Sequence, residues 1–413
     1  MSESAEQLKK NYFWNTLGSL MNAASSALLL LIVTRFTGAY SAGVFSIAYA
    51  VGQQFLSVGS FEMRTYQATD SEGRFPFSVY LGSRVVTVVL MALTIIVYAL
   101  YADGPTYDAL LIVLIAGLRF FDATEDVFHG MFQQRGRLDI AGRAFFFRVL
   151  TTTVLFSAGA ILTGDLLICC LLSAVGSLAV EVILNLPPAK KYENAIKLSF
   201  EWKSLARLLA ACFPLFIASF LLNDLVNVPR FGIEAVMQKE TQTVYSILYM
   251  PAMIINLLVG FVFKPLLTSL AEKWSSGDRL GYYGILGKGA ALIVVALILA
   301  MAVAYPYGTP VLSWLYGVDV SSYRTELMAI LIGGAFNALS VILYYGLVTV
   351  RLQGLVVVGY GVSVLVAHAL SGVMIAESGL MGAVLLYDLS MGLLAALFVA
   401  FLFLGLRIAG RQS

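Results

Sequence analysis

Charged side chains are scarce in this sequence. Only 12% of its 413 residues are Asp, Glu, Lys or Arg, whereas 60% are hydrophobic. Soluble globular domains carry about 25% charged residues, so the composition excludes an ordinary soluble domain of this length. The formal net charge of +2 gives no sign of a nucleic-acid partner, and we expect none.

Metal-ligating and nucleophilic residues are also few, because the chain has three cysteines and two histidines. Cys169, Cys170 and Cys212 lie inside long apolar runs, without the spacing of a metal site or a disulfide framework. We expect them to be small apolar packing residues. His129 and His368 are isolated in the sequence and are expected to be packing or interfacial residues.

Motifs of enzymes and of nucleotide-binding proteins are absent. The sequence contains no HExxH, no GxxxxGK(S/T) and no CxxC pair. We therefore expect no cofactor, no bound metal and no enzymatic activity. If the chain moves a solute, the energy must come from an ion gradient, from the membrane potential or from the gradient of the cargo.

Long hydrophobic runs fill most of the chain. A helix that crosses a membrane needs about 20 mainly apolar residues. The pattern predicts an all-α integral membrane protein with about twelve transmembrane helices. The longest connections lie near 188–205 and 306–325 and are too short for a soluble domain, so any function must reside in the helices. The runs cover residues 12–35, 41–63, 78–101, 107–132, 143–163, 165–187, 206–229, 241–270, 284–305, 326–350, 354–376 and 379–405.

Lysine and arginine gather in every second connection and in both tails. Because such residues stay on the cytoplasmic side of a membrane, both termini are predicted to be cytoplasmic. The basic connection 188–205 divides the runs into two sets of six. The predicted organisation is a cytoplasmic tail at 1–10, an N-lobe at 11–187, a cytoplasmic linker at 188–205, a C-lobe at 206–405 and a cytoplasmic tail at 406–413.

A short internal similarity suggests that the two lobes are copies of one unit. Residues 45–49 (FSIAY) resemble residues 245–249 (YSILY), and Arg64 recurs as Lys264 at the same offset. Because each set has six runs, the two copies would have the same orientation in the membrane. The repeat predicts two six-helix lobes.

Polar residues align on one face of several runs at helical spacing. Asn22 lies on the stripe of the first run and Gln53 on that of the second; Asn223 and Asn227 lie on the seventh, and Asn256 on the eighth. Matching stripes in the two halves predict a central polar cavity between the lobes, in which these amides would bind a polar cargo. The alternative is that small polar residues only hold the helices together.

The fourth run carries charges where the chain should be most apolar, at Arg119, Asp122, Glu125 and Asp126. An ionised side chain at the centre of a membrane helix costs about 2.5–3.5 kcal/mol, so these groups must face protein or a water-filled cavity. The planar guanidinium of Arg119 suits a phosphate group, and an ion pair with Asp122 or Glu125 is the alternative. The carboxylates would repel a diphosphate, and we expect them to form ion pairs that hold or gate the cytoplasmic side.

For Arg64, Lys264 and Asp224 the sequence allows more than one role. Arg64 and Lys264 join the candidate gating or ion-pairing group. Asp224 could exchange a coupling cation, or it could cap a helix or pair with Arg230.

Three more arginines lie near the ends of predicted runs. Arg35 is a candidate substrate ligand at the rim, with a snorkelling anchor as the alternative. Arg84 and Arg148 lie near the cytoplasmic ends of their runs, and we expect them to reach the lipid headgroups or to attract anionic lipid, with binding of the cargo as the alternative.

Several segments resemble a known family. They include residues 61–70 (FEMRTYQATD) and 132–143 (FQQRGRLDIAGR), together with Trp14 and Gly18, and the likeness is densest over residues 10–148. They resemble bacterial polysaccharide flippases of the O-antigen (Wzx-type) and teichoic-acid repeat-unit kinds. These belong to the multidrug/oligosaccharidyl-lipid/polysaccharide transporter superfamily.

The resemblance implies a two-lobed transporter in the bacterial plasma membrane that opens alternately to each side. Its cargo would be an oligosaccharide linked through diphosphate to undecaprenol, flipped to the outer leaflet for synthesis of cell-surface polysaccharide. Membrane lipids would be partners, together with a polysaccharide polymerase or glycosyltransferases. The alternatives are a cation-coupled multidrug antiporter of the same fold, a membrane-embedded glycan polymerase or glycosyltransferase, and an interaction partner that transports nothing.

Overall fold

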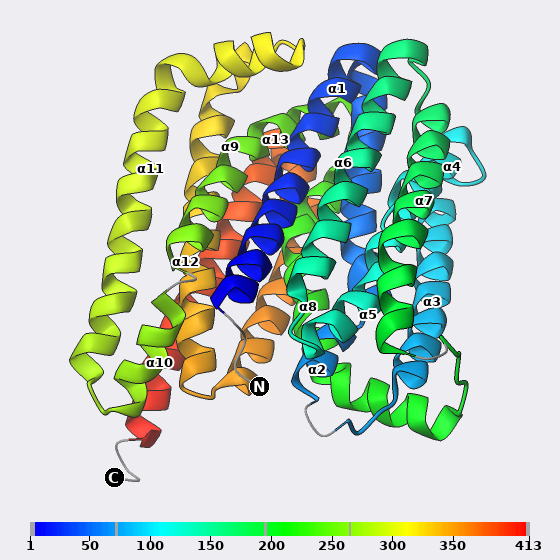
Figure 1. The fold of residues 1–413 in the computed structure, drawn as a ribbon. Helices are drawn as coiled ribbons and strands as arrows, with labels where there is room; N and C mark the ends of the chain where they lie inside the picture. Colours follow the sequence, from blue (N-terminus) through cyan, green and yellow to red (C-terminus); the bar gives the residue numbers. More distant parts are fainter. Residues whose placement is uncertain (1–4, 71–72, 194–195, 264–265, 410–413) are drawn as a thin grey trace. The chain divides into compact units, whose positions relative to one another are not determined.

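Backbone groups inside a membrane meet no water, and a helix satisfies them within one segment. In a computed structural model of the chain, which describes residues 5–70, 73–193, 196–263 and 266–409, the apolar runs accordingly form helices, and these residues contain no strand (Figure 1). Eight of the described helices are long and apolar enough to span a membrane. The predicted all-α membrane fold is confirmed.

Short connections join thirteen α-helices in the described residues, and a short 3₁₀ turn at Ser321–Tyr323 precedes the twelfth. The helices are α1 (Ala5–Ser60), α2 (Met63–Thr69), α3 (Phe77–Asp103), α4 (Tyr107–Gly117), α5 (Phe120–Gln134), α6 (Leu138–Thr163), α7 (Leu166–Tyr192), α8 (Trp202–Val236), α9 (Lys239–Phe263), α10 (Leu267–Ser275), α11 (Arg279–Tyr316), α12 (Arg324–Thr349) and α13 (Gln353–Ala409).

Two labels each cover a pair of predicted runs. In α1 the helical backbone is interrupted at Gly38 (φ 90°), between the first and second runs, and in α13 it is interrupted at Gly379 (φ 57°), where the last run was predicted to begin. Glycine adopts these positive φ angles without the steric cost of a Cβ atom. The predicted connection at 306–325 is wrong in its first half, because α11 stays helical to Tyr316 through Pro306 and Pro310.

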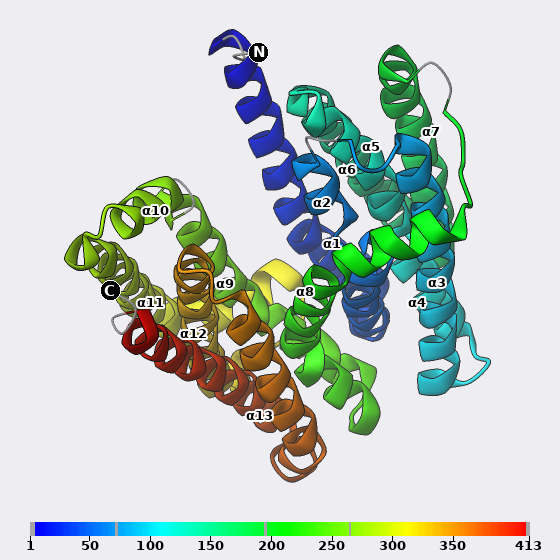
Figure 2. The same cartoon turned by 90° about the horizontal axis from the view of Figure 1, so that it is seen from below.

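Residues 1–223 and 224–413 form two compact units, and the boundary lies inside α8. We call them the first unit and the second unit. Within the first unit, α1 packs along α6, and α6 packs along α7, which lie side by side in Figure 2. Within the second unit, α12 packs against α9, α11 and α13.

Small residues bring the helices of each unit close together. A Cβ atom on Gly142 of α6 would lie 2.6 Å from the backbone of Trp14 in α1, and one on Gly334 of α12 would lie 3.1 Å from Cα of Ala252 in α9. Such close approach of helix backbones is typical of membrane proteins. It fixes the positions from which the functional side chains project.

Candidate functional site

The charged run of the sequence lies at a break between two helices. The fourth predicted run is divided into α4 and α5, and Arg119 stands at the junction. There the amide of Leu118 donates to the carbonyl of Ile115, and the amide of Arg119 donates to that of Ala116, at 3.2 and 3.1 Å. Such a tightened i→i−3 turn inside a helix often marks a functional position.

The Arg119 side chain extends from this junction towards α1. Gly52 of α1 leaves room for it, because a Cβ atom there would lie 3.0 Å from Cγ of Arg119. Nη1 of Arg119 donates to Oδ2 of Asp122 at 2.8 Å, and the guanidinium carbon lies 4.5 Å from the centre of the Tyr49 ring. The ion pair between Arg119 and Asp122 that the sequence left open is therefore present.

Arg148 of α6 joins the same cluster. It is 3% exposed and makes ion pairs with Asp122 and with Glu125, the second at 2.6 Å. His129 follows, with Nε2 3.8 Å from Oε2 of Glu125. The expectation that Arg148 reaches the headgroups is wrong, because two buried carboxylates on α5 hold it inside the protein. His129 is 3% exposed and its ring lies 6.3 Å from that of Phe145, as expected of a packing residue.

A second ion-paired cluster forms around Asp126 of α5. Arg84 of α3 is 1% exposed, and its Nη2 lies 2.8 Å from Asp126, while its Nη1 donates to the carbonyl of Gly59. Arg64 lies 3.7 Å from the same carboxylate and donates to Gln133. The expectation that Arg84 reaches the headgroups is wrong, because Asp126 and a backbone carbonyl hold it inside the protein.

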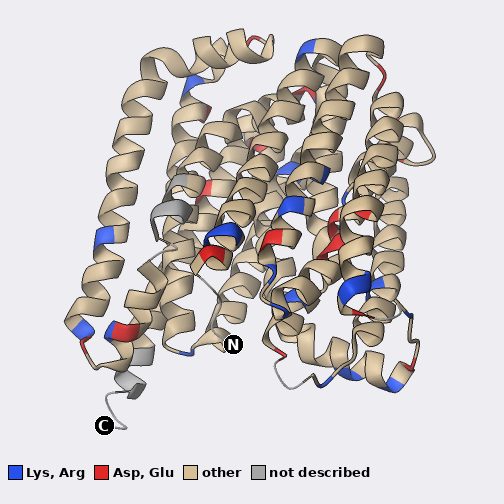
Figure 3. Ribbon diagram, viewed as in Figure 1, with Lys and Arg blue, Asp and Glu red and all other residues tan. Residues whose placement is uncertain are grey.

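Charge balance explains these clusters. An unpaired charge in a membrane interior is expensive, and removing one partner of a buried ion pair costs about 3–5 kcal/mol. Each of Asp122, Glu125 and Asp126 has at least one arginine within ion-pair distance. Figure 3 shows the acidic and basic residues of the first unit next to one another midway along its helices.

A small cavity of about 50 Å³ lies against the first cluster, enclosed by α1, the α4–α5 junction and α6. It has room for a few water molecules. Two guanidinium groups and one carboxylate border it, and Glu125, which pairs with Arg148 at 2.6 Å, balances the second guanidinium. Its polar lining consists of Asn22, Ser25, Tyr49, Arg119, Asp122, Arg148, Thr152 and Thr153.

Other predicted residues of the first unit lie away from this cavity. Gln53 is half-buried, whereas its neighbour Gln54 is the buried amide and donates to the carbonyl of Phe220 at 3.3 Å. Arg35 is exposed, three residues before the bend at Gly38. Asn223 is half-buried at the boundary between the units. Of the predicted ligands in this unit, the structure brings together Asn22 and Arg119.

The second unit contains a related arrangement that the sequence did not reveal. Arg230 of α8 lies over two rings of α9, 4.6 Å from the centre of Tyr249 and 5.7 Å from that of Tyr245. Its Nη1 donates to Oδ1 of the predicted ligand Asn227 at 3.0 Å. The sequence offered Arg230 only as a partner of Asp224, and the repeated FSIAY and YSILY segments were the one signal of its tyrosine neighbours.

The other predicted residues of this unit have different partners. Oδ2 of Asp224 and Nε2 of His368 form a hydrogen bond at 2.9 Å, a contact that the sequence did not predict for either residue. Asn256 donates to the carbonyls of Ala252 and Gly334 and links α9 to α12. Lys264 lies outside the described residues. In the described part of the chain, no three His, Cys, Asp or Glu side chains are grouped as a metal would require.

Comparisons with known proteins identify the fold. No protein-family model matches the chain, and no curated protein sequence matches it. Among solved structures, the lipid II flippase MurJ in an inward closed conformation is similar with a TM-score of 0.69 and 13% identity, covering 96% of this chain and 87% of that one. The eukaryotic MATE transporter AtDTX14 is similar with a TM-score of 0.66 and 14% identity, covering 97% and 96%.

A third solved structure is a MOP superfamily transporter from Pyrococcus furiosus, with a TM-score of 0.58, 13% identity and coverage of 98% and 96%. At identities this low, the likeness concerns the fold alone. The chain therefore has the fold of MOP superfamily transporters and is a multi-pass membrane protein. The fold that the resemblance implied is confirmed.

Proposed function

We propose that this chain flips undecaprenyl-diphosphate-linked oligosaccharide repeat units from the cytoplasmic to the outer leaflet of the bacterial plasma membrane, by alternating access. In this proposal the product supplies cell-surface polysaccharide synthesis. The chain would then work with membrane lipids around it, and with glycosyltransferases before and a polysaccharide polymerase after the transport step.

One observation supports this proposal most directly: each unit holds an arginine against a tyrosine ring, and the two tyrosines occupy matching positions of the similar segments 45–49 and 245–249. Arg119 lies over Tyr49 in the first unit, and Arg230 lies over Tyr249 in the second. A guanidinium group stays charged and donates a planar pair of hydrogen bonds, which suits a diphosphate. A ring fixes the guanidinium without neutralising it.

The residues around Arg119 suit the rest of such a cargo. Asn22, Thr152 and Thr153 border the same cavity and offer amide and hydroxyl groups to sugar hydroxyls. The cavity of about 50 Å³ is too small for a sugar, so the proposal requires the helices around it to separate during transport. The helix break beside Arg119 and the bend at Gly38 are places where the backbone can change direction.

The test combines cells and vesicles. In cells that depend on this chain for surface polysaccharide, Arg119→Ala is expected to abolish export while the protein remains in the membrane, because the diphosphate loses a cation. Arg135→Ala, which removes an arginine that is 52% exposed and 3.6 Å from Glu193, is the matched control. Normal export by the Arg119 variant would contradict the proposed role of this residue.

In vesicles, the purified protein is expected to move a fluorescent polyprenyl-diphosphate saccharide across the bilayer. Failure to do so would contradict the proposed cargo.

A cation-coupled multidrug antiporter of the same fold is the second candidate. The half-buried Asp224, hydrogen-bonded to His368 in the second unit, is the observation that favours it, because a carboxylate beside an imidazole can bind and release a cation. In the first unit, by contrast, arginines already balance the buried carboxylates. Gradient-dependent expulsion of organic cations, lost in Asp224→Asn, would favour the antiporter.

A further inference from the structure

A second pocket of the first unit lies apart from the charged run. It has a volume of about 360 Å³ and lies where α1 begins, α6 begins and α7 ends. We call it the α1–α6 pocket, after the two helices that supply its charged and aromatic groups. Its polar and aromatic lining consists of Lys10, Trp14, Arg137, Asp139 and Arg143.

The acidic residue in this pocket, Asp139, already accepts hydrogen bonds from Arg137 and Gln7. Arg137 donates two hydrogen bonds to the Asp139 carboxylate, from Nε and Nη2, both at 2.9 Å. Gln7 donates a third at 2.8 Å, and the backbone amide of Asp139 donates to Asn11 at 2.8 Å. Asp139 therefore pins the start of α1 to the start of α6, and little of its charge is left for another cation.

Arg143 is placed differently. It is exposed, and no carboxylate of the described residues lies within ion-pair distance of it. Its guanidinium carbon lies 5.9 Å from the centre of the Trp14 ring and 6.0 Å from that of Phe147. Two aromatic rings orient this cation without neutralising it, so it keeps its full affinity for an anion.

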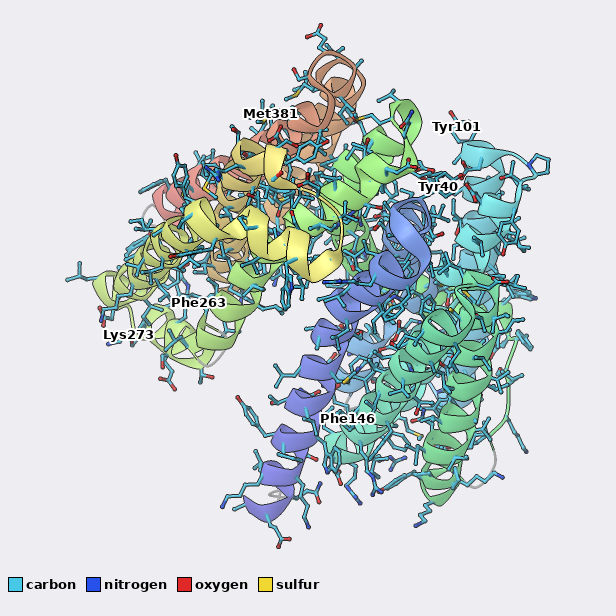
Figure 4. All side chains as sticks on the ribbon, turned by 90° about the horizontal axis from the view of Figure 1, so that it is seen from above. Tyr40, Tyr101, Phe146, Phe263, Lys273 and Met381 are labelled. Carbon is cyan, nitrogen blue, oxygen red and sulfur yellow. The ribbon has the colours of Figure 1, made fainter. Side chains whose placement is uncertain are left out.

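The aromatic wall is built by the close packing of α1 and α6. Gly142 allows the backbone of Trp14 to approach, and the Trp14 ring lies 6.1 Å from the ring of Phe146. Phe146 is labelled in Figure 4, where α1 lies beside α6. Trp is enriched at membrane–water interfaces, where one side of a ring meets lipid and the other meets water.

Apolar surface continues from the pocket along the helices. Phe13, the neighbour of Trp14, is 59% exposed, and Ile183, the neighbour of the lining residue Leu184, is 63% exposed. In a membrane protein such surface meets acyl chains. A ligand that places an anion on Arg143 and a chain on this surface is a lipid rather than a free phosphate ion.

We propose that the α1–α6 pocket binds the phosphodiester of an anionic membrane phospholipid. Arg143 takes the phosphate oxygens, Lys10, whose Nζ also pairs with the exposed Glu6 at 2.7 Å, lies at the rim, and Trp14 lies at the level of the glycerol. Basic pockets between membrane helices on the cytoplasmic side are known to hold such headgroups. With Asp139 paired to Arg137, the available charge matches a monoanion better than a diphosphate. This proposal does not depend on the transport function.

Native mass spectrometry of the purified full chain tests it, with phosphatidylglycerol and phosphatidylethanolamine titrated separately into delipidated protein. Phosphatidylglycerol is expected to bind about tenfold more tightly than phosphatidylethanolamine, whose amine meets the basic residues unfavourably. Arg143→Gln is expected to weaken phosphatidylglycerol about tenfold and to leave phosphatidylethanolamine unchanged. Equal binding of the two lipids, or no loss in Arg143→Gln, would overturn the proposal.

Matched variants separate this pocket from general surface charge. Arg135→Gln removes the same charge from an exposed arginine that already has Glu193 as partner, and it is expected to bind phosphatidylglycerol like the unmodified chain. An equal loss in this control would overturn the proposal. Arg143→Lys keeps the charge but not the planar stacking, so about a threefold loss is expected.

Two further measurements complete the design. The thermal unfolding midpoint of Arg143→Gln should be unchanged, because no carboxylate loses its partner. If the midpoint falls, the binding of phosphatidylglycerol by Arg143→Lys is the measurement that tests the proposal. A polyprenyl diphosphate added as competitor should displace phosphatidylglycerol poorly. If polyprenyl diphosphate displaces phosphatidylglycerol at a concentration below that at which phosphatidylglycerol itself half-saturates the protein, the phospholipid assignment is overturned.

Discussion

The two compact units hold an arginine against a tyrosine in electrically different ways. In the first unit, Arg119 lies over Tyr49 and also pairs with Asp122, which in turn pairs with Arg148. In the second, Arg230 lies over Tyr249 and bonds to the neutral amide of Asn227. No carboxylate among the described residues lies within ion-pair distance of Arg230. The tyrosines occupy matching positions of the repeat, whereas the arginines come from unrelated helices.

This difference separates two tasks of a buried arginine. In the first unit, arginine neutralises carboxylates that would otherwise be unpaired inside the membrane. In the second, the ring and the amide orient the guanidinium but leave its charge available to an anion. Substitutions should therefore reduce stability in the first unit more than in the second, and the following experiments measure that contrast.

The largest effect is expected for Arg148→Met. It leaves Glu125 without its arginine and Asp122 with one partner instead of two, which should reduce the free energy of unfolding by about 3–5 kcal/mol. Thermal unfolding of the purified protein in detergent measures it. Arg143→Met, five residues further towards the start of the same helix and exposed, is the control. An unchanged midpoint for Arg148→Met would show that the network does not stabilise the first unit.

A smaller effect should distinguish the two arginine–tyrosine pairs directly. Arg119→Gln removes a charged hydrogen bond at 2.8 Å to a buried carboxylate and should cost about 1.5–3 kcal/mol. Arg230→Gln leaves only an amide and two rings without their cation, and should cost less than about 1 kcal/mol. Thermal unfolding midpoints of the two variants, measured in the same detergent, test this. An equal loss of stability in both would contradict the proposed difference between the two units.

Packing beside Arg119 offers a third test. Gly52→Ala places a Cβ atom 3.0 Å from Cγ of Arg119 and 3.1 Å from Cα of Ala116, and such overpacking should cost about 1–3 kcal/mol. Gly361→Ala in α13 is the control, because nothing lies within 4 Å of a Cβ atom there. It should be neutral or slightly stabilising. A neutral Gly52→Ala would mean that the α4–α5 junction moves freely away from α1.

The smallest effect concerns the rings. Tyr49→Leu and Tyr249→Leu should each cost about 1 kcal/mol more than the corresponding Phe variants, because leucine has no ring face for the guanidinium. The distances to the ring centres, 4.5 and 4.6 Å, predict equal losses in the two units. Unfolding midpoints of the four variants measure this. A loss confined to one unit would show that only that arginine depends on its ring.

The sequence offered an ion pair of Arg119 with Asp122 or Glu125 as one of two alternatives, and the first of these partners is three residues away on one helical segment. It missed the pairs of Arg148 with Asp122 and of Arg84 with Asp126, whose members are 26 and 42 residues apart. Spacing along one helix is a local property, whereas contacts between helices depend on how the helices are rotated against each other. The same reason hid the pair of Asp224 and His368, which are 144 residues apart.

The sequence by itself determined that the chain is an all-α membrane protein, because the length and apolarity of a run decide whether it can cross a bilayer. It also indicated where charge must be sheltered, since an ionised group in an apolar run needs a partner. Only the tertiary structure decided which partner each charge has and which arginine keeps its charge available. Close helix packing at Gly52 and Gly142 brings these groups within a few ångströms, and no local pattern encodes those distances.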